Sequence, residues 1–287
     1  MGRRFDTVSF LSDFGVVDES AGVVRSVIRD LAPHVQVIDL THDIAPFDVR
    51  AGSLALARAI QYVATGVVLA VVDPGVGTAR RAIAIEVADG AGVLIGPDNG
   101  LLAPAVAMAG GAGRSVVLTN SSFHLTSSRT TFDGRDVFGP VASHLCNGVD
   151  LAEFGDIVDP ITLLPGVVPL SRVDGDDLVT EVMWVDRFGN AQLNIGPEEI
   201  DGWGPSVRLR FGDAEVRVAS LSTAYGTIGP GIGLVTDSHG MVTIALDRSS
   251  AAIELGLAPG AEVRISRAGG AGGSPGVTTP LAFPGRR

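Results

Sequence analysis

The sequence predicts an α/β domain with a mostly parallel sheet, followed by a small β-barrel domain. Strand-like and helix-like segments alternate through the first half of the chain, which is the rhythm of β-α-β units. A Pro-rich connector begins at about Asp159, and the short strand-like segments after it show almost no helical pattern. We therefore expect domains at residues 1–163 and 164–267, and a disordered Gly-rich tail at 268–287.

The elements of the first domain follow from their local patterns. Residues 5–12 have the composition of a strand, and residues 66–73 form a continuous apolar run typical of a strand buried on both faces. Residues 20–31 and 49–63 carry apolar side chains at helical spacing, which predicts two amphipathic helices. The other expected elements are strands at 35–40, 82–87, 93–95 and 115–118 and helices at 101–108 and 137–146.

The second domain is predicted from short apolar segments that recur between turn residues. This spacing is expected of a small barrel or sandwich. The expected strands are at 178–185, 191–195, 207–211, 215–218, 233–236, 242–246 and 261–266.

Composition indicates a soluble, cytoplasmic protein. With 46% hydrophobic and 18% charged residues and a mean hydropathy of +0.35, the 287-residue chain is not of the disordered class. Its longest apolar runs are far shorter than the roughly 20 residues of a membrane span, and its first residues lack the core of a signal peptide. The single cysteine, Cys146, excludes an internal disulfide and is expected on an apolar helix face.

The charge balance excludes several partners and chemistries. A net charge of −11 disfavours nucleic acids and anionic membranes, and we find no local basic patch. All 21 basic residues are arginine, so a lysine Schiff base and a Walker-type lysine are both excluded. An acidic protein is compatible with a cationic small molecule.

Polar clusters directly after the strands are the candidate site, because open α/β sheets bind ligands at the carboxyl ends of their strands. They lie at residues 12–20, 41–48 and 73–80, and a fourth cluster at 131–136 precedes a helix. In the first cluster Asp13, Asp18 and Ser20 are either a polar ligand clamp or ordinary turn and N-cap residues.

Other sites have weaker signals. Gly75 and Gly77 alone are poor support for a phosphate loop, and a Gly-x-Ser-x-Gly nucleophile elbow is absent from the sequence. His42 with Asp43, or His144, lacks the paired spacing of metal ligands. We therefore expect no metal and no cofactor.

Six motifs together resemble one family, the S-adenosyl-L-methionine (SAM) hydroxide adenosyltransferases. These adenosine-forming hydrolases are relatives of the fluorinase and chlorinase. The similarity extends in the same order up to about residue 266. The motifs are FLSDFG (10–15), DLTHDIAPFD (39–48), VVDPGVGTAR (71–80), GPDNGLL (96–102), GRDVF (134–138) and DRFGN (186–190).

The resemblance implies SAM as substrate and a homotrimer with sites between neighbouring subunits. It also implies hydrolysis of SAM to adenosine and L-methionine by direct displacement at the ribose C5′, without metal or covalent intermediate. By motif position, the implied binding roles are Asp13 for the ribose hydroxyls, Asp18, Ser20 and Asp186 for the methionine amino end, Phe47 and Tyr225 for the apolar walls, and Asn190 for adenine.

The implied catalytic residues are Asp73, Arg80 and Asp133. Hydroxide-using members carry an Asp-Arg-His set with Asp and Arg spaced as Asp73 and Arg80 are, whereas the halogenases do not. A carboxylate at Asp73 repels a halide but accepts a hydrogen bond from water. The histidine of the family motif is replaced here by Asp133.

This departure leaves alternatives open. Asp133 either binds a proton and acts as an acid or base, or only hydrogen-bonds Arg80, and His124 is a candidate substitute for the missing histidine. A protein that binds adenosine or SAM with little turnover is the alternative function, and a SAM-dependent halogenase is a third.

Overall fold

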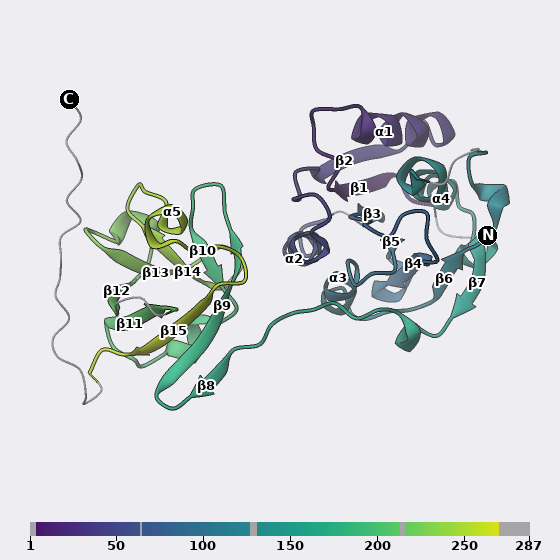
Figure 1. Ribbon diagram of the computed structural model, residues 1–287. Helices are drawn as coiled ribbons and strands as arrows, with labels where there is room; N and C mark the ends of the chain where they lie inside the picture. Colours follow the sequence, from purple (N-terminus) through teal and green to yellow (C-terminus); the bar gives the residue numbers. More distant parts are fainter. Residues whose placement is uncertain (1–3, 64, 127–130, 213–215, 270–287) are drawn as a thin grey trace, which may run out of the picture. The chain divides into compact units, whose positions relative to one another are not determined.

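The computed structural model describes residues 4–63, 65–126, 131–212 and 216–269 (Figure 1). The chain divides into two compact units, Met1–Val168 and Pro169–Arg287. The predicted boundary lay earlier, after residue 163. The connector stays with the first unit because Arg81 donates to the carbonyl of Thr162 at 2.5 Å and Leu164 N donates to Asp98 at 2.8 Å. From residue 270 on, the predicted tail lies outside the described residues.

The first unit is built on a seven-stranded sheet of order β2-β1-β3-β5-β4-β6-β7. The pairs β1–β2, β1–β3 and β3–β5 are parallel, and β4–β5, β4–β6 and β6–β7 are antiparallel. The strands are β1 (Thr7–Ser12), β2 (Gln36–Thr41), β3 (Val67–Val71), β4 (Ala82–Val87), β5 (Gly92–Pro97), β6 (Ser115–Leu118) and β7 (Gly155–Val158).

The α/β class is confirmed, but the sheet is mixed rather than mostly parallel. Only the turn Ala88–Gly90 and Ala91 connect β4 to β5, which is too short for the crossover that parallel neighbours require. The last strand, β7, was not predicted, because its four residues Gly-Asp-Ile-Val carry too little pattern.

Helices cover both faces of this sheet (Figure 1). Helices α1 (Ser20–Leu31) and α4 (Gly139–Cys146) contact each other over one face, and α2 (Val49–Ile60) and α3 (Ala103–Met108) contact each other over the other. Alternation along β1 divides its side chains between the two cores. The carboxyl ends of β1, β2 and β3 therefore share one edge of a three-layer unit.

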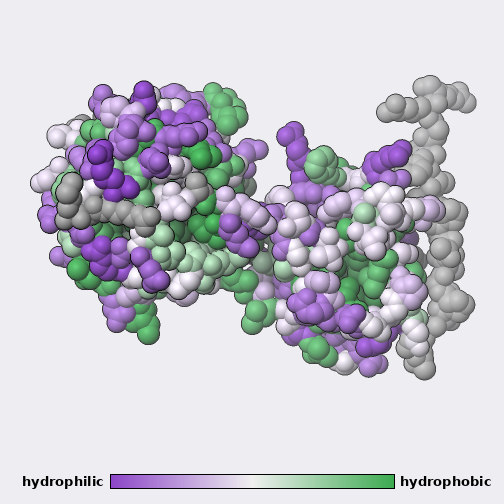
Figure 2. All heavy atoms as spheres, turned by 180° about the vertical axis from the view of Figure 1, so that it is seen from behind, coloured by the Kyte–Doolittle hydropathy of each residue, from purple (hydrophilic) through white to green (hydrophobic). Residues whose placement is uncertain are grey.

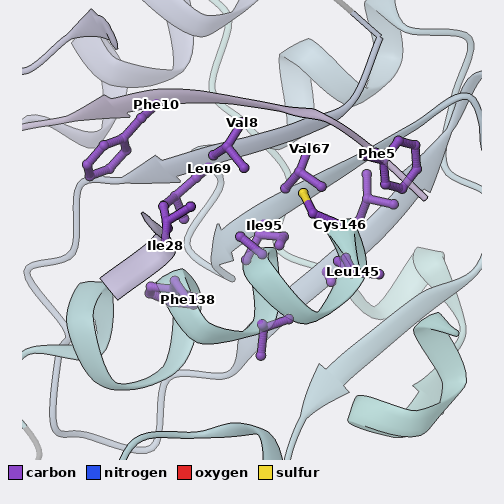
Figure 3. Close-up of a cluster of buried hydrophobic side chains, with 14 of the residues drawn as sticks. Phe5, Val8, Phe10, Ile28, Val67, Leu69, Ile95, Phe138, Leu145 and Cys146 are labelled. Carbon is purple, nitrogen blue, oxygen red and sulfur yellow. The ribbon is translucent and has the colours of Figure 1, made fainter. Parts of the chain in front are cut away.

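Cys146 lies in the core under α4, as the sequence predicted (Figure 3). It is fully buried beside Val67 and Phe5, and this burial raises the pKa of its thiol to about 12. The thiol is therefore a packing group and not a nucleophile.

Short helical turns complete the first unit. They are the 3-10 turns Ala88–Gly90, Ser121–Phe123, Leu151–Phe154 and Pro160–Thr162, and the π turn Gly134–Phe138 that runs into α4. The π turn extends the helix expected at 137–146 toward Asp133. Such turns often occur at functional sites.

The second unit is a closed barrel of seven strands in the order β10-β14-β13-β12-β11-β15-β9, closed by the pairing of β9 with β10. This confirms the predicted β-barrel. The short strand β8 (Arg172–Asp174) extends the sheet as a hairpin with β9. The barrel strands are β9 (Asp177–Val185), β10 (Ala191–Leu193), β11 (Ser206–Phe211), β12 (Arg217–Ser222), β13 (Ile232–Thr236), β14 (Val242–Leu246) and β15 (Glu262–Arg267).

Two elements of the barrel unit were not predicted, β8 and the one-turn helix α5 (Ala251–Leu255). Both are too short to establish a periodicity. Two 3-10 turns, Pro197–Ile200 and Tyr225–Thr227, connect barrel strands.

On the face shown in Figure 2, hydrophobic and hydrophilic residues are interspersed over both units. In the part of the chain that the structure describes, no helix combines the length and apolarity needed to cross a membrane.

Candidate active site

Asp13 and Phe47 meet at the carboxyl ends of β1 and β2. Asp13 lies directly after β1, and its Oδ2 accepts a hydrogen bond from the backbone N–H of Phe47 at 2.9 Å. Phe47 has a φ of 68°, a conformation that costs a side-chain-bearing residue about 1–2 kcal/mol. Phe47 is 72% exposed, so core packing does not account for its strained backbone conformation. This conformation instead places the ring at the surface.

Asp18 and Ser20 lie together at the start of α1. The backbone N–H of Ser20 donates to Asp18 Oδ1 at 3.3 Å, so Asp18 has the turn role considered from the sequence, while the N-cap of α1 is Glu19. Both residues also present polar groups at the positive end of the α1 dipole. A turn role and a ligand-binding role are compatible here.

Asp73, Arg80 and Asp133 form one buried ion cluster, although Asp133 is distant from the other two in sequence. Arg80 Nε donates to Asp73 Oδ1 at 3.1 Å, and Arg80 Nη2 donates to Asp73 Oδ2. The same Nη2 donates to Asp133 Oδ2 at 2.6 Å. Only 8% of the Arg80 side chain is exposed, with 6% for Asp73 and 18% for Asp133. The structure thus brings together the three residues predicted as catalytic.

A folded turn brings Arg80 back onto Asp73. Within it, Thr78 Oγ1 donates to the carbonyl of Gly75 at 2.7 Å and accepts from the Arg80 N–H at 3.3 Å. Gly77 has a φ of 77°, which a glycine adopts without strain. The two glycines of this motif therefore shape the turn around the ion cluster.

Aromatic rings hold the other side of the cluster. Gly134 follows Asp133, and a Cβ on it would approach the Phe14 ring to 2.9 Å, so only glycine fits at this point. The guanidinium of Arg80 lies 5.5 Å from the centre of the Phe138 ring. Asp133 and Arg80 are in this way fixed by packing as well as by hydrogen bonds.

The cluster carries one positive and two negative charges. Burial raises the pKa of Asp73 and the nearby negative charge of Asp133 raises it further, while Arg80 acts in the opposite direction. Arg80 Nη1 is buried, and no hydrogen-bond partner for it lies among the described residues. Asp73, a carboxylate with a raised pKa, is thus bonded to an arginine whose Nη1 has no partner among the described residues. This combination is suited to holding and deprotonating a small polar molecule.

His124 lies within electrostatic reach of this cluster. Its Nε2 is buried and has no hydrogen-bond partner in the described residues. Burial lowers the pKa of His124, and the charge of Asp133 opposes that shift. The imidazole is therefore predominantly neutral at pH 7.

A second group of predicted residues lines a pocket of about 720 Å³ in the barrel unit. Asp186, Asn190 and Tyr225 all contribute to it. Asp186 Oδ1 accepts the backbone N–H groups of Phe188 and Asn190, both at 2.9 Å, and its Oδ2 accepts from the Asn190 amide at 2.8 Å. The DRFGN motif is a turn organised by its own first carboxylate, and it leaves the side-chain oxygen of Asn190 as an acceptor.

Tyr225 forms another wall of this pocket. Burial raises the pKa of its hydroxyl, and the negative charges of Asp237 and Asp186 contribute to the same shift. The hydroxyl is therefore a neutral donor at physiological pH, at the edge of a ring that is 41% exposed.

Sequence reasoning missed the polar segment that follows β14. Asp247, Arg248, Ser249 and Ser250 line the barrel pocket, and Arg248 has a φ of 53°. A Cβ on Gly189 would approach the Ser250 hydroxyl to 2.0 Å, so the glycine of DRFGN permits the two loops to pack. The signal was present, because polar residues directly after a strand were the criterion used in the first domain.

Comparison with known proteins assigns both units to one family. Residues 8–155 match the SAM hydroxide adenosyltransferase N-terminal domain, and residues 180–264 match the C-terminal domain of the same family. The chain belongs to the SAM hydroxide adenosyltransferase family.

Similar proteins agree with this membership. An (R)-S-adenosyl-L-methionine hydrolase from Salinispora tropica is 44% identical, over 90% of this chain and 97% of that protein. A fluorinase from Actinoplanes sp. is 23% identical, over 91% of this chain and 97% of its own length. The crystal structure of an uncharacterized conserved protein from Thermotoga maritima has a TM-score of 0.82 at 31% identity, covering 91% of this chain and 100% of that one.

Asp133 is the residue for which the motif resemblance implied a histidine. Asp133 binds Arg80 without displacing Asp73, since both carboxylates share Nη2 of the guanidinium. The described residues contain no group of three or more His, Cys, Asp and Glu side chains that could hold a metal ion. His42, considered above as a ligand, is instead bonded to Ser12 and Asp39.

Proposed function

We propose that the protein hydrolyses SAM to adenosine and L-methionine, as the names of its closely similar relatives suggest for them. The observation that carries the proposal is the buried Arg80, which is held by Asp73 and Asp133 and whose Nη1 has no hydrogen-bond partner among the described residues. The family name states the chemistry, because transfer of an adenosyl group to hydroxide yields adenosine.

In the proposed mechanism, Arg80 Nη1 donates a hydrogen bond to a water oxygen and Asp73 accepts a proton from that water. The water oxygen forms a bond to C5′ of the ribose as the C5′–S bond breaks. The bonding electron pair goes to the sulfonium sulfur, which becomes the neutral thioether of methionine. The leaving group needs no proton, so the protein has only to orient and deprotonate the nucleophile. The proton on Asp73 then returns to solvent.

We assign the binding residues to the ends of this substrate. In the first unit, Asp13 takes the ribose hydroxyls, Phe47 gives an apolar wall, and Asp18 and Ser20 take the methionine amino end. In the barrel unit, Asp186 also serves the amino end, Tyr225 gives a second wall, and the acceptor oxygen of Asn190 receives a hydrogen bond from the adenine amino group.

The charge of the ion cluster favours water over halide as nucleophile. Two carboxylates flank one arginine, and a halide entering beside them meets a net negative charge. A neutral water molecule pays no such electrostatic penalty and can donate to a carboxylate. The alternative function, binding of adenosine or SAM with little turnover, is favoured by the Asp133 departure alone.

One experiment separates these functions. Purified protein is incubated with SAM, with and without chloride, and the products are separated by chromatography. We expect adenosine and methionine in equal amounts, independent of chloride. A chlorinated nucleoside would identify a halogenase, and binding of SAM without product would identify a binding protein.

We also propose an oligomeric state and a cellular location for the protein. A homotrimer with sites between neighbouring subunits is supported by exposed apolar side chains such as Val17 and Leu170, which are 100% and 87% exposed in the single chain. Light scattering of the purified protein tests the trimer. We also propose that the activity needs no metal and that the protein is cytoplasmic.

A further inference from the structure

A chain of four side chains connects the end of β1 to the end of β2 and to α1. Ser12 Oγ lies 2.7 Å from His42 Nδ1, and His42 Nε2 lies 3.0 Å from Asp39 Oδ1. The other oxygen of Asp39 accepts from Arg25 Nη1 at 2.5 Å. Ser12 is fully buried and His42 is 6% exposed, while Asp39 and Arg25 extend to the surface. None of these four residues has a role in the proposed mechanism.

The hydrogen bonds have one consistent direction. The Asp39 carboxylate accepts only, so His42 donates to it from Nε2 and the neutral ring accepts at Nδ1. Ser12 therefore donates its hydroxyl proton to His42. The Ser12 oxygen in turn accepts the backbone N–H of Phe14 at 3.3 Å. Every donor in this chain has an acceptor when His42 is neutral.

The set has the composition of a Ser-His-Asp nucleophile triad, but the geometry argues against that function. Ser12 has 0% exposure, so a substrate carbonyl has no access to its oxygen. The ring of His42 packs edge-on against Phe10 with centres 4.6 Å apart, inside the core of the unit. The chain of bonds is therefore a positioning device.

What it positions is the loop that carries Asp13. Three bonds hold this loop: Phe14 N to Ser12 Oγ, Gly15 N to the carbonyl of His42 at 2.7 Å, and Asp13 N to the carbonyl of Val71 at 3.3 Å. His42 contributes to two of them, one through its side chain and one through its backbone. Asp13 then holds the strained Phe47 through the bond already described.

We propose that His42 is a positioning residue for the nucleoside end of the substrate. Through Ser12 it sets the loop that aims Asp13 at the ribose hydroxyls. The inference rests on the proposed function, because the ribose role of Asp13 is part of it. We call these four hydrogen-bonded side chains the relay. The His42–Ser12 bond is the half of the relay that affects binding, and the Asp39–Arg25 half holds the imidazole in its tautomer.

Two isosteric variants separate the halves of the relay. In His42→Asn the side-chain oxygen takes the place of Nδ1 and still accepts from Ser12. In His42→Gln the amide nitrogen takes the place of Nε2 and still donates to Asp39. Ser12→Ala removes the hydroxyl alone. Ser143→Ala is the matched control, because Ser143 is also fully buried and donates to a backbone carbonyl at 2.8 Å, in α4.

The readout is the ratio of dissociation constants for 2′,3′-dideoxyadenosine and adenosine, measured by calorimetry without turnover. This ratio reports the ribose hydroxyl contacts, and a loss of folded protein alone does not change it. We expect Ser12→Ala and His42→Gln to lower the ratio roughly tenfold, about the effect of one misplaced hydrogen bond to a charged group. In His42→Asn and Ser143→Ala this ratio should stay close to that of the unaltered protein.

The outcomes are distinct. An unchanged ratio in Ser12→Ala and His42→Gln would overturn the inference and leave the proposed function intact. Equal losses in His42→Asn and His42→Gln would also overturn it, since the Ser12 bond would then not be the decisive one. If the unaltered protein neither forms adenosine from SAM nor binds adenosine, the proposed function fails and this inference fails with it.

Discussion

At the residue scale, the distinctive feature of the protein is one arginine shared by two carboxylates. Only 8% of the Arg80 side chain is exposed, and it contacts both Asp73 and Asp133. A buried pair with a matched charge count would be neutral, whereas this set retains a negative charge. Burial raises the pKa of Asp73, the charge of Asp133 raises it further, and Asp73 is therefore a stronger base than an ordinary aspartate.

Arg80→Ala should abolish turnover while leaving ligand affinity nearly unchanged. Arg80 is assigned to the attacking water, so its loss removes an interaction made in the transition state. We expect kcat to fall by at least about 10²-fold, the usual effect of losing one such donor. Steady-state kinetics and adenosine calorimetry measure the two quantities.

The neighbouring arginine is the control for this substitution. Arg81 pairs with Asp98 and the connector instead of the ion cluster, so Arg81→Ala should retain kcat. Near-normal turnover in Arg80→Ala would show that the arginine does not act on water.

Asp133→Asn should move the acid limb of the pH profile of kcat/KM to lower pH. Asp73 must be ionised to accept a proton, so activity falls as pH drops through its pKa. The charge of Asp133 contributes to raising that pKa, and removing the charge lets Asp73 stay ionised at lower pH. A limb that stays in place or moves to higher pH contradicts the electrostatic coupling, whatever the absolute rate of the variant.

At the scale of elements, the site depends on how strands end and helices begin. The residue after β1 is Asp13, and Phe47 stands immediately before Asp48, whose carboxylate caps α2 by accepting from Ala51 N at 2.8 Å. The chain turns just before α2, where Asp48 N donates to the carbonyl of Ala45 at 3.0 Å, and Phe47 has its positive φ within this turn. The Phe47 ring, which we propose as a substrate wall, is therefore presented from a strained residue between β2 and α2.

Replacing Phe47 by glycine should give a more stable protein than replacing it by alanine. Both changes remove a largely exposed ring, but only glycine relieves the left-handed backbone. We expect Phe47→Gly to exceed Phe47→Ala by about 0.5–1 kcal/mol in the free energy of unfolding, measured by denaturant titration. Both variants should bind substrate more weakly. Equal stabilities would mean that the turn relaxes when the ring is removed.

At the scale of the whole molecule, the predicted site residues form two groups, an ion cluster with its neighbouring loops in the first unit and a pocket in the barrel unit. The leaving group of SAM is already activated by its positive charge, so neither group has to supply a Lewis acid. In the proposed mechanism, the first unit orients and deprotonates the water, and the barrel pocket receives the adenine.

Activity should therefore be unaffected by a chelator. We expect the same rate of adenosine formation before and after dialysis against EDTA, with added Mg²⁺ or Zn²⁺ giving no increase. A loss of activity that a divalent ion restores would contradict metal independence and would direct attention to residues outside the described ranges.

The sequence by itself determined most of the elements, because their causes are local. Helical spacing predicted α1 at its observed bounds, and a continuous apolar run predicted the buried strand β3. Polar residues after strands marked the edge where Asp13, Phe47 and Asp73 occur. The short elements β7, β8 and α5 were not predicted, because they display no period and β7 and β8 lack the apolar run that marks the equally short β6.

Only the tertiary structure decided which of these residues meet. Local pattern could not reveal that β4 turns back beside β5, or that Arg80 binds Asp133 from a turn 53 positions later. Nor could it show that His42 bonds Ser12, 30 positions earlier, rather than binding a metal. Such contacts depend on the packing of strands and helices far apart in the chain. Their energies come from burial and charge, which a residue acquires only when the fold surrounds it.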